Sequence, residues 1–372
     1  MAKAYGAYSS IYPLMKLFSI CSARPNFVKL AAVHHALAAL NRSDIHHQIV
    51  HTGQHYDPFF SDEFFRELAI PTPSINLEIA NGTNEEQQKR VQEACTELFQ
   101  KNRPDMIIVY GDVNGAAAAA RAAHQQGIKI AHVEAGLRSF DSSMPEEHNR
   151  IAIDKVASLL FVTEQSGIDN LKKEEITEGV HLVGNTMIDT LIRMLPAIKK
   201  QKTVENIGKS YAVVTLHRPS NVDQKETLTA LVDFLIELHQ KTPIVFPLHR
   251  RTQARLSDFG LLDRLSNNIH VLEPLPYLAF KRLVLDASFV LTDSGGIQEE
   301  TAYLQKKCFT MRPNTERPVT IACGSNELVD VIAKKGDRNR VLSYAQDPVA
   351  FQSSIPPLWD GKAGERIIGK LQ

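Results

Sequence analysis

The sequence contains few cysteines, and no two of the four lie close together. Cys21, Cys95, Cys308 and Cys323 form no CxxC pair and no metal-ligand spacing, so we predict neither a disulfide framework nor a metal site. Scattered cysteines are typical of a reducing compartment, which favours the cytoplasm. No apolar run approaches the ~18 residues that a membrane helix needs, so we expect no membrane partner.

Net charge and a glycine fingerprint are also missing. Lys and Arg together number 42, and so do Asp and Glu, which leaves no overall field to attract nucleic acid or anionic lipid. No GxGxxG segment follows a predicted strand, so the sequence does not indicate a bound nicotinamide cofactor. We therefore expect a protein without cofactor, metal or nucleic-acid partner.

Short β-branched runs alternate with helix-length stretches along the whole chain. Continuous apolar strands separated by helices predict an α/β fold with parallel sheets that are covered on both faces. The strands are predicted at Lys16–Cys21, His47–Thr52, Met106–Tyr110, Ile128–Glu134, Leu159–Thr163, Val180–Val183, Tyr211–Leu216, Pro243–Leu248, Ile269–Leu272, Phe289–Thr292 and Cys308–Met311, and the clearest helices at Pro25–Leu40, Asn84–Lys101, Asn114–Gln126 and Glu226–Gln240.

The length of 372 residues and a polar break near the middle predict two doubly wound, Rossmann-like domains. The break is the segment Lys199–Ser210, and we place a hinge around residues 190–210. A ligand is then expected in the cleft at the carboxyl ends of the strands. The predicted divisions are an N-terminal extension (1–14), an N-terminal domain (15–190), a C-terminal domain (205–350) and a C-terminal helix (351–372) that packs back on the N-terminal domain.

The segment AHVEAGLRSFDSSMPEEHNR, residues 131–150, is rich in carboxylates for a strand end and a helix start. Glu134 ends an apolar run, and Glu146 and Glu147 lie just inside a helix that Pro145 opens. Asp112 directly follows another apolar run, in YGDVN, where a helix N-cap and a catalytic carboxylate are equally consistent with its position. Carboxylates that converge at one sheet edge indicate acid/base chemistry.

Two loops are suited to binding anions. SARPNFVKL opens a helix and adds the charges of Arg24 and Lys29, although solvated helix charges would look the same. DSGGIQEE follows a strand, and its glycines let the backbone approach a ligand closely. We predict a phosphate cradle there, with Glu299 or Glu300 on a sugar hydroxyl. Two anion sites with carboxylates between them suit a nucleotide-linked sugar.

Two His-Arg pairs follow adjacent strands of the second half. His217 and Arg218 lie in TLHRPSN, and His249 lies in FPLHRR, which together predict a cationic rim facing the cleft. Gln54 and His55, in the GQHYD loop, are polar enough to contact a ligand, but a solvated loop is an equally good interpretation.

Eight segments carry a family resemblance. In order from residue 22 to residue 318 they are SARPNFVKL, HTGQHYD, YGD, AHVEAGLRSFDSSMPEEHNR, HLVGNTMID, TLHRPSN, TDSGGIQEE and TERP. Together they resemble the bacterial UDP-N-acetylglucosamine 2-epimerase family of the non-hydrolysing type. The resemblance implies a GT-B architecture, in which two Rossmann-like domains close over the substrate, and a homodimer.

The resemblance also implies a reaction. UDP is eliminated across C1–C2 of UDP-N-acetylglucosamine to give 2-acetamidoglucal, and is added back with the opposite configuration at C2. The product is UDP-N-acetylmannosamine, a precursor of cell-surface polysaccharides. By matching motifs, the catalytic residues are Asp112, Glu134, Glu146 and His217, and the UDP-sugar contacts are Arg24, Lys29, Phe280, Ser294, Gly295, Gly296, Glu300 and Arg317.

The family's effector pocket for a second UDP-N-acetylglucosamine matches Gln54, His55, Glu147, Arg218 and His249. Three motifs depart from the family pattern: SARPN stands for GTRPE, GDVNG for GDTTT, and HRPS for HRRE. These departures leave room for an epimerase that acts on a related UDP-2-acetamido sugar. A GT-B glycosyltransferase that uses a UDP-sugar is the main alternative, and a hydrolysing epimerase that releases free sugar is another.

Overall fold

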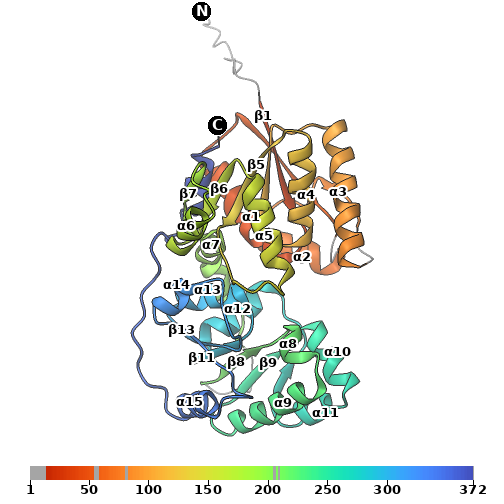
Figure 1. Ribbon diagram of the computed structural model, residues 1–372. Coiled ribbons are helices and arrows are strands. Elements are labelled where there is room, and N and C mark those ends of the chain that lie inside the picture. Colours follow the sequence, from red (N-terminus) through yellow and green to blue (C-terminus); the bar gives the residue numbers. More distant parts are fainter. Residues whose placement is uncertain (1–13, 54–57, 80–82, 204–206, 208–209, 372) are drawn as a thin grey trace, which may run out of the picture.

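The chain folds into two α/β domains, each built on one parallel sheet (Figure 1). The structure is a computed structural model, and it describes residues 14–53, 58–79, 83–203, 207 and 210–371. The N-terminal sheet has the order β3-β2-β1-β4-β5-β6-β7, and the C-terminal sheet the order β10-β9-β8-β11-β12-β13. Numbered within each domain, the orders read 3-2-1-4-5-6-7 and 3-2-1-4-5-6, which is the doubly wound arrangement predicted from the alternation of strands and helices.

The N-terminal sheet is covered by helices on both faces. Separate buried clusters lie on its two sides, one around Leu17 and Tyr110 and the other around Phe18 and Val109. Its strands are β1 (Met15–Cys21), β2 (Ile45–His51), β3 (Ile75–Asn76), β4 (Met106–Tyr110), β5 (Lys129–Ala135), β6 (Leu159–Val162) and β7 (Val180–Leu182), and its helices are α1 (Arg24–Ala39), α2 (Pro58–Glu67), α3 (Asn84–Lys101), α4 (Asn114–Gln125), α5 (Pro145–Val156), α6 (Gln165–Lys173) and α7 (Thr186–Lys200).

The C-terminal sheet is likewise covered on both faces, by clusters around Val214 and Leu291 and around Val213 and Val290. Its strands are β8 (Ala212–Thr215), β9 (Ile244–Pro247), β10 (His270–Leu272), β11 (Phe289–Thr292), β12 (Lys307–Thr310) and β13 (Asn326–Leu328), and the remaining helices are α8 (Pro219–Val222), α9 (Lys225–His239), α10 (Arg250–Asp258), α11 (Leu262–Ser266), α12 (Tyr277–Asp286), α13 (Gly295–Tyr303), α14 (Pro318–Ala322), α15 (Lys335–Gln346) and α16 (Ala363–Ile368).

Every predicted strand is present within two residues of its expected ends, and two strands were missed. The missed strands, β3 and β13, are short edge strands whose sequences carry asparagine rather than an apolar run. The predicted hinge begins too early, because α7 continues through Pro196 to Lys200. This helix contacts α1 as well as α12 and α13, so it lies where the two domains meet.

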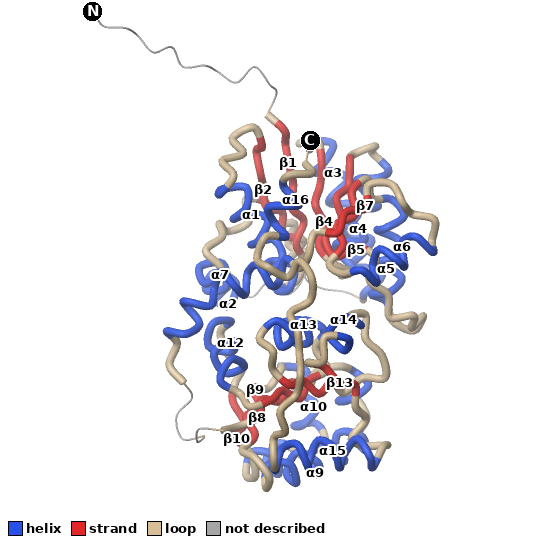
Figure 2. Tube along the Cα trace, turned by 90° about the vertical axis from the view of Figure 1, so that its left-hand side faces the viewer, coloured by secondary structure: helices blue, strands red, loops and turns tan. Residues whose placement is uncertain are grey.

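The C-terminal segment returns to the N-terminal domain. Figure 2 shows the loop after α15 running past the C-terminal domain towards the other sheet, and α16 packs against α1. Trp359, which is fully buried, donates an indole hydrogen bond to the carbonyl oxygen of Thr163 at 3.1 Å. The tail therefore joins the two domains as a second connection beside α7.

The doubly wound order determines where a ligand site can form. In each sheet the order of strand addition reverses between the first and fourth strands, and in such folds ligands bind in the crevice beyond the carboxyl ends of the strands at that point. In the N-terminal domain the loops at this point follow β1 and β4, and they carry SARPN and YGD. In the C-terminal domain they follow β8 and β11, and they carry HRPSN and DSGG.

Candidate active site between the two domains

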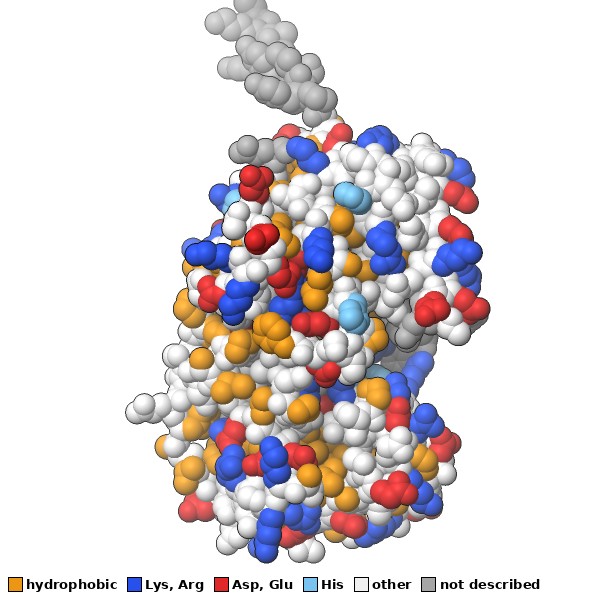
Figure 3. All heavy atoms as spheres, in the orientation of Figure 1, with side chains coloured by type: hydrophobic (Ala, Val, Ile, Leu, Met, Phe, Trp, Pro, Cys, Tyr) orange, Lys and Arg blue, Asp and Glu red, His pale blue; other side chains and the backbone are white. Residues whose placement is uncertain are grey.

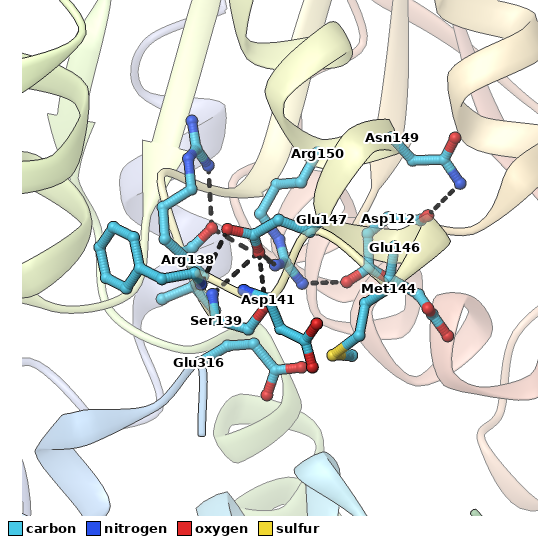
Figure 4. Close-up of polar contacts among 12 residues, drawn as sticks. Asp112, Arg138, Ser139, Asp141, Met144, Glu146, Glu147, Asn149, Arg150 and Glu316 are labelled. Atoms are coloured by element: carbon cyan, nitrogen blue, oxygen red, sulfur yellow. Dashed lines mark hydrogen bonds and ion pairs between the residues drawn. The ribbon is translucent and has the colours of Figure 1, made fainter. Parts of the chain in front are cut away.

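Three carboxylates come from successive elements of the N-terminal domain. Asp112 follows β4, Glu134 lies in β5, and Glu146 lies in the first turn of α5. Asp112 is not the N-cap of α4, because that position is Val113. Its carboxylate forms an ion pair with the buried Arg150 of α5 (Figure 4). The N-cap alternative is therefore wrong, and the carboxylate is held at the edge of the site.

Glu134 is almost completely buried, with 2% of its surface exposed, and its backbone is strained. Its φ of 74° lies in the left-handed region, where a β-bulge interrupts the pairing of β5 with β6. Such a conformation is costly for a residue other than glycine and is typical of functional sites. The strand thus continues to Ala135, one residue beyond the predicted end, and the bulge redirects the Glu134 side chain.

Two cations from different domains neutralise Glu134. Lys29 Nζ lies 2.7 Å from Oε2, and the Arg317 guanidinium of the C-terminal domain lies 3.3 Å from Oε1. Burial alone would raise the pKa of Glu134, but the charges of Lys29, Arg317 and Arg150 lower it to about 2. Glu134 is therefore a carboxylate at every physiological pH in this conformation.

Arg317 also binds carboxylates of its own domain. It lies 2.9 Å from Glu299 and 3.4 Å from Glu316. The predicted glycine Gly295 makes room for it, since a Cβ at Gly295 would lie 2.7 Å from an Arg317 terminal nitrogen. The DSGG loop and Arg317 are consequently packed against Glu134 across the domain boundary.

His217 is held by a buried aspartate that the sequence analysis did not single out. Asp293, the first residue of DSGG, lies 3.0 Å from His217 Nδ1 and accepts the backbone N–H groups of His217 and Arg218. The Asp293 carboxylate fixes the orientation of the His217 imidazole and leaves Nε2 for a ligand. The position of Asp293, directly after a buried strand, was the available signal.

Several other predicted residues lie around this boundary. An Arg218 guanidinium nitrogen lies 3.8 Å from a Glu146 carboxylate oxygen. The centres of the His249 and His217 rings are 5.2 Å apart. Glu300 forms an ion pair with the buried Lys281, which also lies over the Phe280 ring. Ser294 is the N-cap of α13, and Gly296 lies where a Cβ would be 3.0 Å from Met187. Arg24, the first residue of α1, lies with its guanidinium 6.0 Å from the Phe64 ring. Gln54 and His55 lie outside the described residues.

Glu147 supports the loop before α5. Its carboxylate accepts the N–H and hydroxyl of Ser139 at 2.8 and 2.9 Å and the N–H of Phe140 at 3.0 Å. Figure 4 shows it on the opposite side of Arg150 from Asp112, with Arg150 between the two carboxylates. The Glu147 carboxylate therefore holds the conformation of this loop.

One face of the molecule carries no large patch of either charge. On the face shown in Figure 3, acidic and basic side chains are interspersed over both domains.

In the described part of the chain, no set of three or more His, Cys, Asp or Glu side chains is arranged to hold a metal ion. Over the same residues, no helix combines the length and apolar character needed to span a membrane.

A further buried carboxylate links the two domains. Glu164 follows β6, is 4% exposed, and accepts hydrogen bonds from the Ser166 hydroxyl at 2.6 Å and from the Val319 N–H of α14 at 3.3 Å. Its other oxygen is buried without a hydrogen-bond partner. Burial raises the pKa of Glu164 to about 7, with a smaller contribution from Glu299.

This shift predicts a pH dependence. The pKa of Glu164 in the folded protein lies above its usual value of 4.5. Protonated Glu164 therefore contributes its full stability below about pH 4.5, and this contribution is lost as the pH rises through about 7. At 1.4 kcal/mol per pKa unit, the loss is of the order of 3 kcal/mol. In urea unfolding, Glu164→Gln should therefore gain stability relative to the parent between pH 5 and pH 8. If the free energies of unfolding of the parent and the variant differed by the same amount at pH 5 and at pH 8, the raised pKa of Glu164 would be contradicted.

The fold and the site together define a GT-B protein, with carboxylates on one domain facing a histidine and a glycine-rich helix start on the other. The family model for UDP-N-acetylglucosamine 2-epimerase matches residues 38–372. The chain belongs to this family and is an isomerase.

Two relatives and one crystal structure illustrate the match. The UDP-N-acetylglucosamine 2-epimerase of Methanocaldococcus jannaschii is 39% identical over 368 residues, which is 95% of this chain and 98% of the relative. A crystal structure of Methanocaldococcus jannaschii UDP-GlcNAc 2-epimerase in complex with UDP-GlcNAc and UDP is 38% identical, with a TM-score of 0.86, and the match covers 95% of this chain and 99% of that one. The UDP-2,3-diacetamido-2,3-dideoxy-D-glucuronate 2-epimerase of Pseudomonas aeruginosa is 38% identical over 323 residues, 85% of this chain and 88% of the relative.

Proposed function

We propose that the chain interconverts UDP-N-acetylglucosamine and UDP-N-acetylmannosamine by eliminating UDP and adding it back. The observation that carries the proposal is a pair of contacts across the domain boundary, in which Glu134 pairs with Arg317 and Glu146 lies 3.8 Å from Arg218, the neighbour of His217. The C2 proton of the sugar is not next to a carbonyl group and is poorly acidic. A positioned base must therefore remove it as the C1–O bond to UDP breaks.

The reaction needs more than one proton-transfer group. Elimination moves the C2 proton to a carboxylate and leaves 2-acetamidoglucal and UDP in the site. Re-addition requires a proton on the opposite face of C2 while the phosphate oxygen attacks C1. We propose that two of Asp112, Glu134 and Glu146 act as the base and the acid on opposite faces of the sugar. A protonated His217 would neutralise the departing phosphate or donate a proton.

The ion pairs of Glu134 suggest how binding and basicity are linked. Lys29 and Arg317 match UDP-contacting positions, and in this structure both pair with Glu134. A diphosphate would compete with Glu134 for these two cations. As they shift towards the diphosphate, the lowering effect on the Glu134 pKa weakens, and the effect of burial raises that pKa. Substrate binding would thereby convert Glu134 from a weak into a stronger base.

The two domains hold the intermediate between them. Contacts such as Arg317 with Glu134 and Val319 with Glu164 already connect the domains. A closed site keeps water from the glucal and keeps UDP beside it, so that re-addition competes with release. We also propose, on the family resemblance alone, a cytoplasmic homodimer that supplies precursors of cell-surface polysaccharides.

Product analysis tests this proposal. Purified protein incubated with UDP-N-acetylglucosamine should form UDP-N-acetylmannosamine, with no free sugar, as followed by NMR. Release of free N-acetylmannosamine and UDP would instead indicate a hydrolysing enzyme. The second candidate is epimerisation of a related UDP-2-acetamido sugar, which the Pseudomonas relative favours. Turnover of UDP-2,3-diacetamido-2,3-dideoxy-D-glucuronate without turnover of UDP-N-acetylglucosamine would identify it.

A further inference from the structure

A completely buried histidine lies behind the three carboxylates. His132 is in β5, two residues before Glu134, and none of its surface is exposed. Its Nδ1 lies 2.7 Å from Asp154 Oδ1, and its Nε2 lies 2.8 Å from the carbonyl oxygen of Gly111. Both ring nitrogens therefore have a partner, and neither partner belongs to the proposed substrate site.

The partners determine the protonation state. A carbonyl oxygen only accepts hydrogen bonds, so Nε2 must carry a proton that it donates to Gly111. The second oxygen of Asp154 accepts the Gly136 N–H at 3.1 Å and lies 2.8 Å from the Arg138 guanidinium, and these two donors favour the carboxylate form. Nδ1 must then donate as well. A hydrogen on each ring nitrogen would make His132 an imidazolium cation paired with Asp154.

The remaining charges around this pair balance. Arg138 also pairs with Glu174 at 2.7 Å. A protonated His132, Arg138 and Asp154 would form a buried group of three, and Glu174, which is partly exposed, would balance the charge of Arg138 at its edge. Ionised partners strengthen each hydrogen bond in this group, since charge-assisted hydrogen bonds are stronger than neutral ones. Removing one member would leave an unpaired buried charge, which is strongly unfavourable.

Each hydrogen bond of the pair ends beside one of the carboxylates. Gly111 immediately precedes Asp112, and Gly136 lies two residues after the strained Glu134. Asp154 belongs to α5, the helix that begins beside Glu146. A single ion pair is consequently bonded to β4, to β5 with the loop after it, and to α5.

We propose that the His132–Asp154 ion pair is a positioning device that fixes Asp112, Glu134 and Glu146 relative to one another. The pair acts through backbone groups and touches no reacting atom, so its loss should lower kcat more than it changes KM. The kinetic part of this inference rests on the proposed function. The charge state of His132 does not, and it can be measured without substrate.

The first test is NMR of the whole protein labelled with ¹⁵N-histidine, with the His132 signals assigned by their absence in His132→Gln. Both ring nitrogens of His132 should carry a proton in the folded protein, with slowly exchanging N–H protons. A signal that shows one protonated and one bare nitrogen would overturn the proposal, whatever the enzyme's substrate.

The second test compares His132→Gln and Asp154→Asn with the parent. Because displacements of about 1 Å in a catalytic group cost about 10²-fold in rate, each variant should lose roughly 10²-fold in kcat with KM changed less than about threefold. The double variant should be no worse than the more damaged single variant, because the two residues act as one unit. A kcat within about threefold of the parent in both single variants would overturn the proposal.

His47→Gln is the matched control. His47 is a partly buried histidine of β2 in the same sheet, and its Nε2 lies 2.8 Å from the Ser19 hydroxyl of β1. It should lose stability without losing kcat, which separates positioning from general destabilisation. If the parent itself shows no turnover in the assay, the proposed function fails, and the NMR result still decides the charge state of His132.

Discussion

Glu134→Gln is expected to lower kcat by about 10²–10⁴-fold, the range for loss of a general acid or base. The variant keeps the shape of the side chain and the left-handed backbone at residue 134, but it cannot accept the C2 proton. Asp112→Asn should cost a similar factor. Near-normal turnover in both variants would show that neither carboxylate takes part in the chemistry.

Asp189→Asn is the matched control for this loss. Asp189 of α7 is a buried carboxylate that accepts the Gly364 N–H at 2.7 Å, and it lies against the C-terminal segment. Burial raises its pKa to about 6, so a neutral amide is a mild change there. The control should keep its kcat within about threefold while passing through the same purification and assay.

Arg317→Met is expected to produce the largest loss of stability. It removes the cation that lies between Glu134 and Glu299, and breaking a buried ion pair in this way costs about 3–5 kcal/mol. Without the guanidinium, the folded-state pKa of both carboxylates should rise. Urea unfolding should therefore show a large deficit at pH 8 and a smaller one at pH 5, where protonation relieves the unpaired charges.

The sign of this pH dependence follows from the parent. The lowered pKa of Glu134 stabilises the parent above about pH 4.5, and this contribution is lost only as the pH falls towards 2. In the variant a raised pKa makes stability fall as the pH rises. Arg340→Met, which breaks an exposed pair with Glu327, should change stability little at either pH. If Arg317→Met lost the same amount of stability at pH 5 and at pH 8, unpaired carboxylate charges could not be the cause of the loss.

Much of the fold could be predicted because it depends on local patterns. The apolar runs of the central strands, and the helices that separate them, are visible in the sequence, and the two switch points follow from that alternation. The edge strands β3 and β13 could not be predicted, because each has only two or three residues and little apolar character. The hinge was placed around residues 190–210 from the polar segment Lys199–Ser210, yet α7 packs against α12 and α13 and stays helical as far as Lys200.

The partners of the candidate site residues were much less predictable. Position after a strand was enough to single out Asp112, Glu134 and His217. Arg317 and Glu134 are 183 residues apart, and only the meeting of the two domains reveals their pairing. Arg150 and His132 lie within the carboxylate-rich segment itself, but a buried cation that supports a carboxylate has no sequence signature separate from a surface charge. Asp293 was visible as part of DSGG, and its bond to His217 was not.

Deuterium exchange at C2 tests the central claim most directly. The protein is incubated with UDP-N-acetylglucosamine in deuterated water without any acceptor, and both UDP-sugars are analysed by NMR and mass spectrometry. Removal and return of the C2 proton predicts that deuterium appears at C2 of the recovered UDP-N-acetylmannosamine and, at equilibrium, of UDP-N-acetylglucosamine. UDP-N-acetylmannosamine formed without deuterium at C2 would contradict the proposed mechanism, and the absence of any epimer or label would contradict the proposed substrate.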